Sequence, residues 1–122
     1  MLFRSETLER LRANRTRMAI GSSSKNTDYI LQRTDLLKYF DAVVDGNNIT
    51  KSKPDPEVFL KAAQFMGANP ADCVVIEDAE AGIRAAKAAG MYAVGIGEAA
   101  GYSETDLGIK DMREIQHLVS FN

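Results

Sequence analysis

Apolar residues in this chain follow two alternating patterns, short continuous runs and longer stretches with helical spacing. The runs predict β-strands at 17–20, 40–45, 73–76, 92–96 and 107–109. The helical spacing predicts helices at about 5–14, 26–33, 56–66 and 79–89, and one more after residue 111. Strands that alternate with helices of this length indicate an α/β fold, a Rossmann-like parallel sheet with helices on both faces.

Several helix ends carry their own signals. Asp55 is predicted as the N-cap of the helix at 56–66, Pro56 as its first residue and Gly67 as the residue that ends it. Asp111 and Glu114 stand at capping-box spacing and predict the start of the last helix.

Composition narrows the class of protein. The 122 residues fit one domain and carry 15 basic and 17 acidic side chains, a net charge of −2. No broad basic field is present to attract nucleic acid or an anionic membrane, and the apolar runs are too short to span a bilayer. The single cysteine, Cys73, forms no internal disulfide, which fits a cytoplasmic location, and its place in an apolar run predicts a small core residue. The single histidine, His117, argues against a histidine-based triad or zinc site.

The segment 21–26, Gly-Ser-Ser-Ser-Lys-Asn, is a candidate anion site. A strand, a Gly/Ser turn and a helix start present hydroxyls and backbone N–H groups together, at the positive end of a helix dipole. The alternative is that a serine merely caps an ordinary helix.

A second candidate site combines a lysine and two carboxylates. Lys53 precedes the helix at 56–66, and Glu77 and Asp78 follow the apolar run at 73–76. Carboxylates at the carboxyl end of a parallel strand lie where open α/β sheets bind ligands. One hard cation on oxygen ligands together with one lysine suits phosphoryl chemistry, so the pattern suggests Mg²⁺. The alternatives are a solvated lysine and an Asp78 that only caps the helix at 79–89.

Together, Ser22, Lys53 and the pair Glu77-Asp78 resemble the motifs of the haloacid dehalogenase superfamily of phosphatases and phosphomutases. The runs 53–59 (Lys-Pro-Asp-Pro-Glu-Val-Phe) and 77–91 are specific to this group, and the segment 22–26 is most similar to its β-phosphoglucomutases. The resemblance covers residues 5–100 and implies Mg²⁺-dependent interconversion of sugar 1- and 6-phosphates through an aspartyl-phosphate.

The resemblance also implies a role for each matching residue. Ser22 and the backbone of Ser23 would bind the phosphoryl group in transit, and Lys53 would neutralise its charge. Glu77 and Asp78 would help to hold Mg²⁺. The second phosphate of a glucose bisphosphate would be bound by the three residues that follow, Ser24, Lys25 and Asn26.

The family's first motif, Asp-x-Asp, which supplies the nucleophile, does not occur in the sequence, and neither does the helical cap domain. We therefore expect residues 1–122 to be the C-terminal portion of such a core domain, inactive alone. In the family, the nucleophile strand lies between the strands that correspond to 17–20 and 73–76. These two strands should face a gap or pair directly, and their edges invite either the missing N-terminal segment or self-association.

Two alternatives to a mutase remain open. One is a phosphatase of the same family that acts on small sugar phosphates. The other is a non-catalytic phosphate-binding module that assembles with a separate chain.

Overall fold

The computed structural model describes residues 9, 11–13, 15–22, 37–111 and 114. The strands among them are β1 (Ala19–Gly21), β2 (Ala42–Val44), β3 (Val74–Glu77), β4 (Tyr92–Ile96) and β5 (Leu107–Ile109). The α-helices are α3 (Glu57–Met66) and α4 (Glu80–Ala88), and the 3-10 helices are η1 (Leu37–Tyr39), η2 (Pro70–Asp72) and η3 (Gly97–Gly101). Residues 9 and 11–13 are also helical, within the helix predicted at 5–14. The helix predicted at 26–33 lies outside the described residues.

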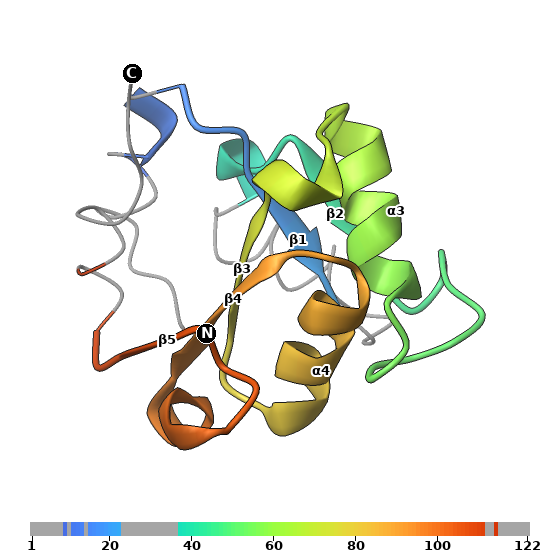
Figure 1. Ribbon diagram of the computed structural model, residues 1–122. Coiled ribbons are helices and arrows are strands. Elements are labelled where there is room, and N and C mark those ends of the chain that lie inside the picture. Colours follow the sequence, from blue (N-terminus) through green and yellow to red (C-terminus); the bar gives the residue numbers. More distant parts are fainter. Residues whose placement is uncertain (1–8, 10, 14, 23–36, 112–113, 115–122) are drawn as a thin grey trace.

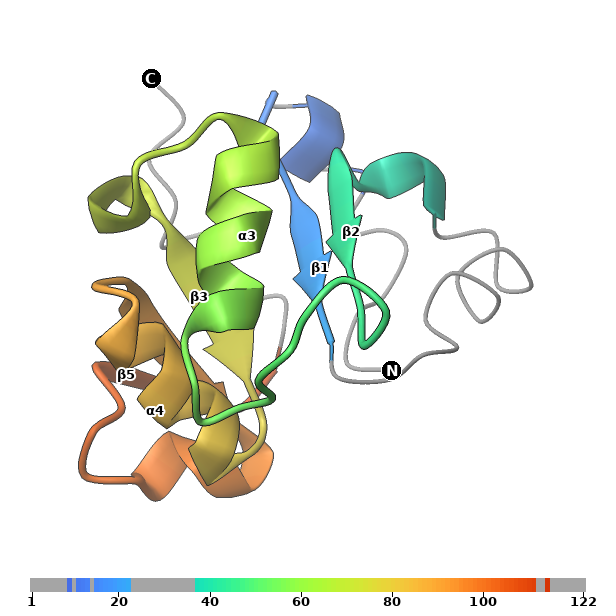
Figure 2. The same ribbon diagram turned by 90° about the vertical axis from the view of Figure 1, so that its right-hand side faces the viewer.

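The strands form two parallel sheets instead of one. β1 pairs with β2, and β3, β4 and β5 form the second sheet in that order. β1, β2 and β3 run in the same direction, from top to bottom in Figure 2. The parallel α/β class is confirmed. Of the two outcomes expected for the strands at 17–20 and 73–76, direct pairing is not found, because no ladder joins β1 to β3 among the described strands.

Helices and apolar side chains link the two sheets on both faces. α3 packs on β1 and β2 and α4 on β3 and β4, and the two helices also contact each other (Figure 1). Their side chains share one apolar cluster with the strands, which includes Val44, Val58, Val75, Ile83 and Ala93. A second cluster on the opposite face joins Leu11, Met18 and Tyr39 to residues of β4 and β5, namely Val94, Ile96 and Ile109. Apolar side chains thus join the two sheets on both of their faces.

The first two strands are shorter than predicted. At Met18, the backbone N–H donates to Asp41 Oδ2 at 2.8 Å and the carbonyl accepts from the Asp41 N–H at 2.7 Å. The parallel ladder begins only at the next pair, Ala19 and Ala42. At the far end of β2, Asp45 Oδ1 accepts from the Asn47 N–H at 2.8 Å and closes a turn.

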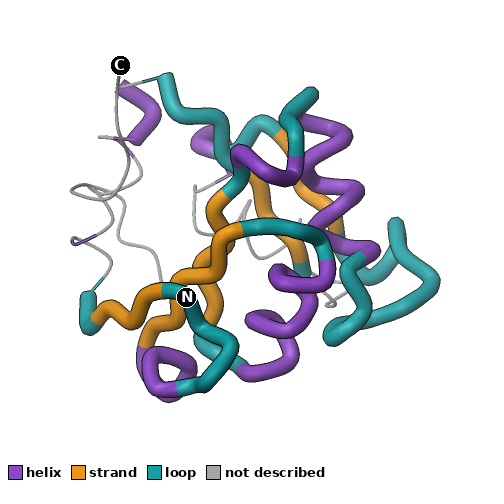
Figure 3. The backbone as a smooth tube through the Cα atoms, in the orientation of Figure 1, coloured by secondary structure: helices purple, strands orange, loops and turns teal. Residues whose placement is uncertain are grey.

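The start of α3 is displaced by one residue from the prediction. Pro56, not Asp55, occupies the N-cap position. Asp55 nevertheless performs the predicted capping, because its Oδ1 accepts from the Glu57 N–H at 3.0 Å. Gly67 ends the helix with a left-handed φ of 69°, as predicted. Figure 3 shows the long loop that leads from β2 into this helix.

The C-terminal half follows the prediction closely. β4 and β5 have the predicted limits, β3 begins one residue later than predicted, and α4 is one residue shorter at each end. Cys73 precedes β3 and is only partly buried against the core cluster. Glu114 Oε2 accepts from the Asp111 N–H at 3.0 Å, which is one half of the predicted capping box. No helix in the described part of the chain is long and apolar enough to cross a membrane.

Candidate phosphoryl-transfer site

The structure brings Lys53 and Glu77 together from segments 24 residues apart. Lys53 Nζ donates to Glu77 Oε1 in a hydrogen-bonded ion pair. Lys53 lies in the loop before α3, and Glu77 is the last residue of β3. Their side chains are 18% and 11% exposed, so solvent screens this pair less than a surface pair.

The aromatic ring of Phe59 connects Lys53 to the end of β1. Lys53 Nζ lies 4.9 Å from the centroid of this ring, within the range of a cation–π interaction. The ring also packs on Gly21, where an added Cβ would lie 3.0 Å from Phe59 Cδ1. A glycine is therefore favoured at the last position of β1, directly before Ser22. The Phe59 ring thus contacts both Lys53 and Gly21, the last residue of β1.

Ser22 lies directly after β1. Its N–H donates to the Val44 carbonyl at 2.9 Å, so the backbone at this point is tied to β2. Gly21, Lys53, Glu77 and Asp78 all line one cavity of about 830 Å³ between the two sheets. The other predicted phosphate-binding residues, Ser23, Ser24, Lys25 and Asn26, lie outside the described residues.

Glu77 is buried because Gly82 leaves room for it. An added Cβ at Gly82 would lie 2.0 Å from Glu77 Cδ, so the carboxyl group occupies the space where a side chain at residue 82 would project. No role for Gly82 was predicted from the sequence. The signal that could have revealed it is a glycine within an alanine-rich helix, where it costs stability unless packing requires it.

Asp78 differs from its neighbour in being exposed. Its carboxylate makes no hydrogen bond or ion pair with any residue that the structure describes. The interpretation that Asp78 caps the following helix is wrong, because Ala79 occupies the N-cap position without a side-chain cap. The carboxylate of Asp78 is therefore available to solvent at the end of β3.

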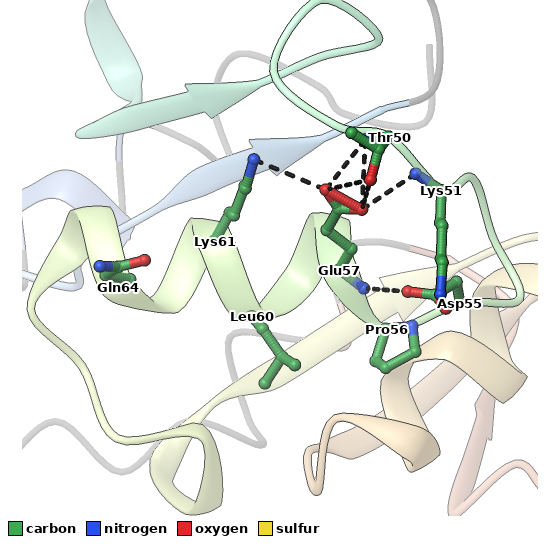
Figure 4. A pocket seen from close by; sticks show the side chains of 8 residues that line it. All are labelled: Thr50, Lys51, Asp55, Pro56, Glu57, Leu60, Lys61 and Gln64. Carbon is green, nitrogen blue, oxygen red and sulfur yellow. Dashed lines mark hydrogen bonds and ion pairs between the residues drawn. The ribbon is translucent and has the colours of Figure 1, made fainter.

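Glu57 anchors the loop that carries Lys53 (Figure 4). Its carboxylate accepts from the backbone N–H groups of Thr50 and Lys51, each at 2.9 Å, and from the Thr50 hydroxyl at 3.1 Å. These hydrogen bonds, led by that from the Thr50 N–H, lower the pKa of Glu57 to about 2. This role of Glu57 was not predicted from the sequence.

Glu77 and Asp78 provide some, but not all, of the ligands that a Mg²⁺ ion requires. Glu77 and Asp78 offer two adjacent carboxylates, and Mg²⁺ in phosphoryl-transfer sites is held by one or two carboxylates, with water and substrate phosphates completing the coordination. Within the described residues, no group of three or more His, Cys, Asp or Glu side chains could hold a metal ion. A bound Mg²⁺ would therefore need ligands in addition to this pair.

A comparison with protein families identifies the fold. A family model described as a haloacid dehalogenase-like hydrolase matches residues 3–90. The chain belongs to this family. The β-phosphoglucomutase of Bacillus subtilis is 42% identical over 105 residues, a match that covers 86% of this chain and 46% of the relative. The fructose-1-phosphate phosphatase YqaB of Escherichia coli is 47% identical over 81 residues, 65% of this chain and 43% of the relative.

Solved structures of the family show the same fold. The crystal structure of β-phosphoglucomutase from Clostridium difficile matches with a TM-score of 0.84 and 30% identity, covering 93% of this chain and 53% of that one. The chain thus spans about half the length of each of these three relatives. The resemblance inferred from Ser22, Lys53 and Glu77-Asp78 is confirmed at the level of the family.

Proposed function

We propose that this chain is the lysine- and carboxylate-bearing part of a phosphosugar-transferring enzyme of the β-phosphoglucomutase type. The observation that carries the proposal is the Lys53–Glu77 ion pair at the carboxyl end of β3, with the exposed carboxylate of Asp78 next to it. A lysine with two carboxylates is the combination needed to bind a phosphate dianion together with a hard cation. The relatives named mutase and phosphatase support the same class of chemistry.

Each residue has a distinct part in this proposal. Lys53 neutralises the charge of the phosphoryl group, and its hydrogen bond to Glu77 holds the ammonium group at the strand end before substrate arrives. Glu77 and Asp78 hold Mg²⁺, which supplies electrostatic stabilisation of phosphate charge when bound. Ser22 donates to a phosphoryl oxygen at the end of β1.

Binding of a second, non-transferring phosphate group would distinguish a mutase from a phosphatase. In the proposal, Ser24, Lys25 and Asn26 bind the non-transferring phosphate of a glucose bisphosphate, which a mutase must retain while the intermediate reorients. A phosphatase that acts on small sugar phosphates would use the same Lys53, Glu77 and Asp78 without this need. The similarity to the E. coli fructose-1-phosphate phosphatase keeps that alternative open.

We expect the 122 residues alone to be inactive, because no Asp-x-Asp motif is present to supply the nucleophile. Binding of phosphate without turnover would then be the property of the isolated chain. A non-catalytic phosphate-binding module is the second candidate function, and turnover by the purified chain would exclude it.

The proposal is tested by calorimetric titration of the chain with inorganic phosphate, with and without Mg²⁺. We expect Mg²⁺ to strengthen phosphate binding and Lys53→Met to abolish binding. The control is Lys110→Met, which removes an exposed positive charge after β5 and should leave binding unchanged. If both variants lost binding equally, the effect would be one of net charge and not of a site at Lys53. If Lys53→Met did not weaken phosphate binding, the proposal would be overturned.

A further inference from the structure

The ammonium group of Lys53 lies between a carboxylate and an aromatic ring. Its Nζ atom donates to Glu77 Oε1 and lies 4.9 Å from the centroid of the Phe59 ring. The lysine side chain is 18% exposed and Phe59 is 7% exposed, so water is largely excluded from this contact. An aromatic face attracts a cation more strongly when both groups are removed from water. The ring is therefore a second source of stabilisation for the charge of Lys53.

The carboxylate and the ring act differently on this ammonium group. An ammonium group has three N–H donors, and among the described residues only Glu77 accepts a hydrogen bond from Lys53 Nζ. The ring stabilises the positive charge without carrying a negative charge of its own. A second carboxylate in its place would cancel the charge of the lysine and repel an incoming phosphate. Phe59 thus leaves Lys53 with a net positive charge and with donors to spare, and both residues line the cavity between the two sheets.

The position of the Phe59 ring is fixed by the end of β1. An added Cβ at Gly21 would lie 3.0 Å from both Cδ1 and Cε1 of Phe59, so the strand backbone packs directly against the ring. The next residue, Ser22, is tied to β2 because its N–H donates to the Val44 carbonyl at 2.9 Å. A ring held in this way fixes where the ammonium group of Lys53 lies relative to the end of β1.

Burial alone does not require an aromatic residue at this position. Phe59 belongs to the apolar cluster that α3 and α4 share with the strands, and apolar residues of similar size are often exchangeable in a core. An aliphatic side chain would fill space there but would not attract the ammonium group. We propose that Phe59 is a positioning residue for Lys53, whose ring holds the ammonium group at the end of β1 and leaves its charge free to bind phosphate. This inference rests on the phosphate site of the proposed function.

The test replaces Phe59 in the full chain with phenylalanine that carries one, two or three ring fluorines. Fluorine withdraws electrons from the ring face, so the attraction of a cation weakens stepwise while size and burial change little. The first readout needs no ligand and is the hydrogen exchange of the Lys53 ammonium protons, followed by NMR. We expect this exchange to become faster with each fluorine, by about tenfold in total. The internal control is Lys87, which donates to Asp106 at 2.7 Å and lies over no aromatic ring among the described residues.

The second readout is calorimetric titration with inorganic phosphate in the presence of Mg²⁺. Phosphate affinity should fall as fluorines are added at Phe59, by about three- to tenfold in total. The same series at Phe65, which is 55% exposed near the end of α3, should leave both readouts unchanged.

Three results would overturn the proposal. They are exchange at Lys53 that does not respond to fluorine at Phe59, an equal response to fluorine at Phe65, and faster exchange with unchanged phosphate affinity. Failure of the proposed function is distinguishable, because the unsubstituted chain would then bind no phosphate. The exchange series, which contains no phosphate, would still decide whether the ring positions Lys53.

Discussion

The carboxyl group of Glu77 lies in the space where a side chain at Gly82 would project, with the position of an added Cβ only 2.0 Å from Glu77 Cδ. This packing lets the carboxylate at the end of β3 turn toward the first turns of α4 while its Oε1 remains bonded to Lys53. The glycine of α4 therefore controls the geometry of the candidate site without contributing a functional group.

Gly82→Ala should disturb the site more than the fold. Alanine is favoured over glycine within a helix by about 0.5–1 kcal/mol, which offsets part of the cost of displacing Glu77. We expect the free energy of unfolding to change by less than about 1 kcal/mol, whereas Mg²⁺ affinity falls about tenfold, as is common when a metal ligand loses its support. Calorimetry with Mg²⁺ and urea unfolding measure the two effects.

The control for this variant is Gly101→Ala. An added Cβ at Gly101 meets nothing within 4 Å, so the same substitution there tests glycine loss alone. If Gly82→Ala retained full Mg²⁺ affinity, the role assigned to the Glu77 packing would be wrong.

Asp78→Asn should weaken Mg²⁺ binding about tenfold or more with little effect on stability. The carboxylate is exposed, so its loss removes a proposed metal ligand without breaking a structural contact. Thermal unfolding should be unchanged within the range of ordinary surface substitutions, about 0.5 kcal/mol. Glu80→Gln, which neutralises an exposed carboxylate in the first turn of α4, is the matched control. Unchanged Mg²⁺ affinity in Asp78→Asn would exclude this residue as a ligand.

Stability should depend on pH through Glu57. Its pKa is about 2 in the folded chain against 4.5 without these contacts, so its stabilising effect is complete above about pH 4.5. As the pH falls from 4.5 toward 2, the unfolded chain takes up a proton that the folded chain does not, and the contribution is lost. Urea unfolding of the wild type and of Glu57→Gln should therefore show a difference in stability that shrinks over this interval. A difference that stays constant down to the lowest pH at which the chain folds would contradict the assignment.

Ala86→Asp should unfold the domain. Ala86 is fully buried where α4 packs on the second sheet, and an aspartate there would bury an unpaired charge. The expected cost exceeds about 3 kcal/mol, a large part of the stability of a small domain. Circular dichroism should show loss of structure, whereas Ala88→Asp, on the exposed side of the same helix, should remain folded.

The fold was predictable because its signals are local. Tyr92–Ile96 and Leu107–Ile109 have the predicted limits, since apolar runs and the glycines and polar residues around them define short strands. The predicted strand limits were wrong where a side chain binds a backbone group that would otherwise join the strand ladder. Asp41 binds the backbone of Met18 and so delays the start of the first two strands.

The charged residues of the candidate site could be predicted from the sequence. The contacts that hold these residues in place could not. Lys53, Glu77 and Asp78 follow from motif spacing, whereas the burial of Glu77 against Gly82 depends on the depth at which α4 packs. The role of Glu57 could not be predicted, because its hydrogen bonds to Thr50 and Lys51 depend on how the preceding loop folds back. Such contacts between separate segments leave no periodic signal in the sequence.

The central claim is that Lys53 and the Glu77-Asp78 pair form a phosphate-binding site. The most direct measurement is an NMR titration of the isotope-labelled chain with inorganic phosphate in the presence of Mg²⁺, following the Lys53 side-chain amine and the backbone amides. The account predicts that the Lys53 resonance and the amides of Glu77 and Asp78 shift together and saturate at a common phosphate concentration. Saturable shifts confined to residues elsewhere, with these three unperturbed, would contradict it.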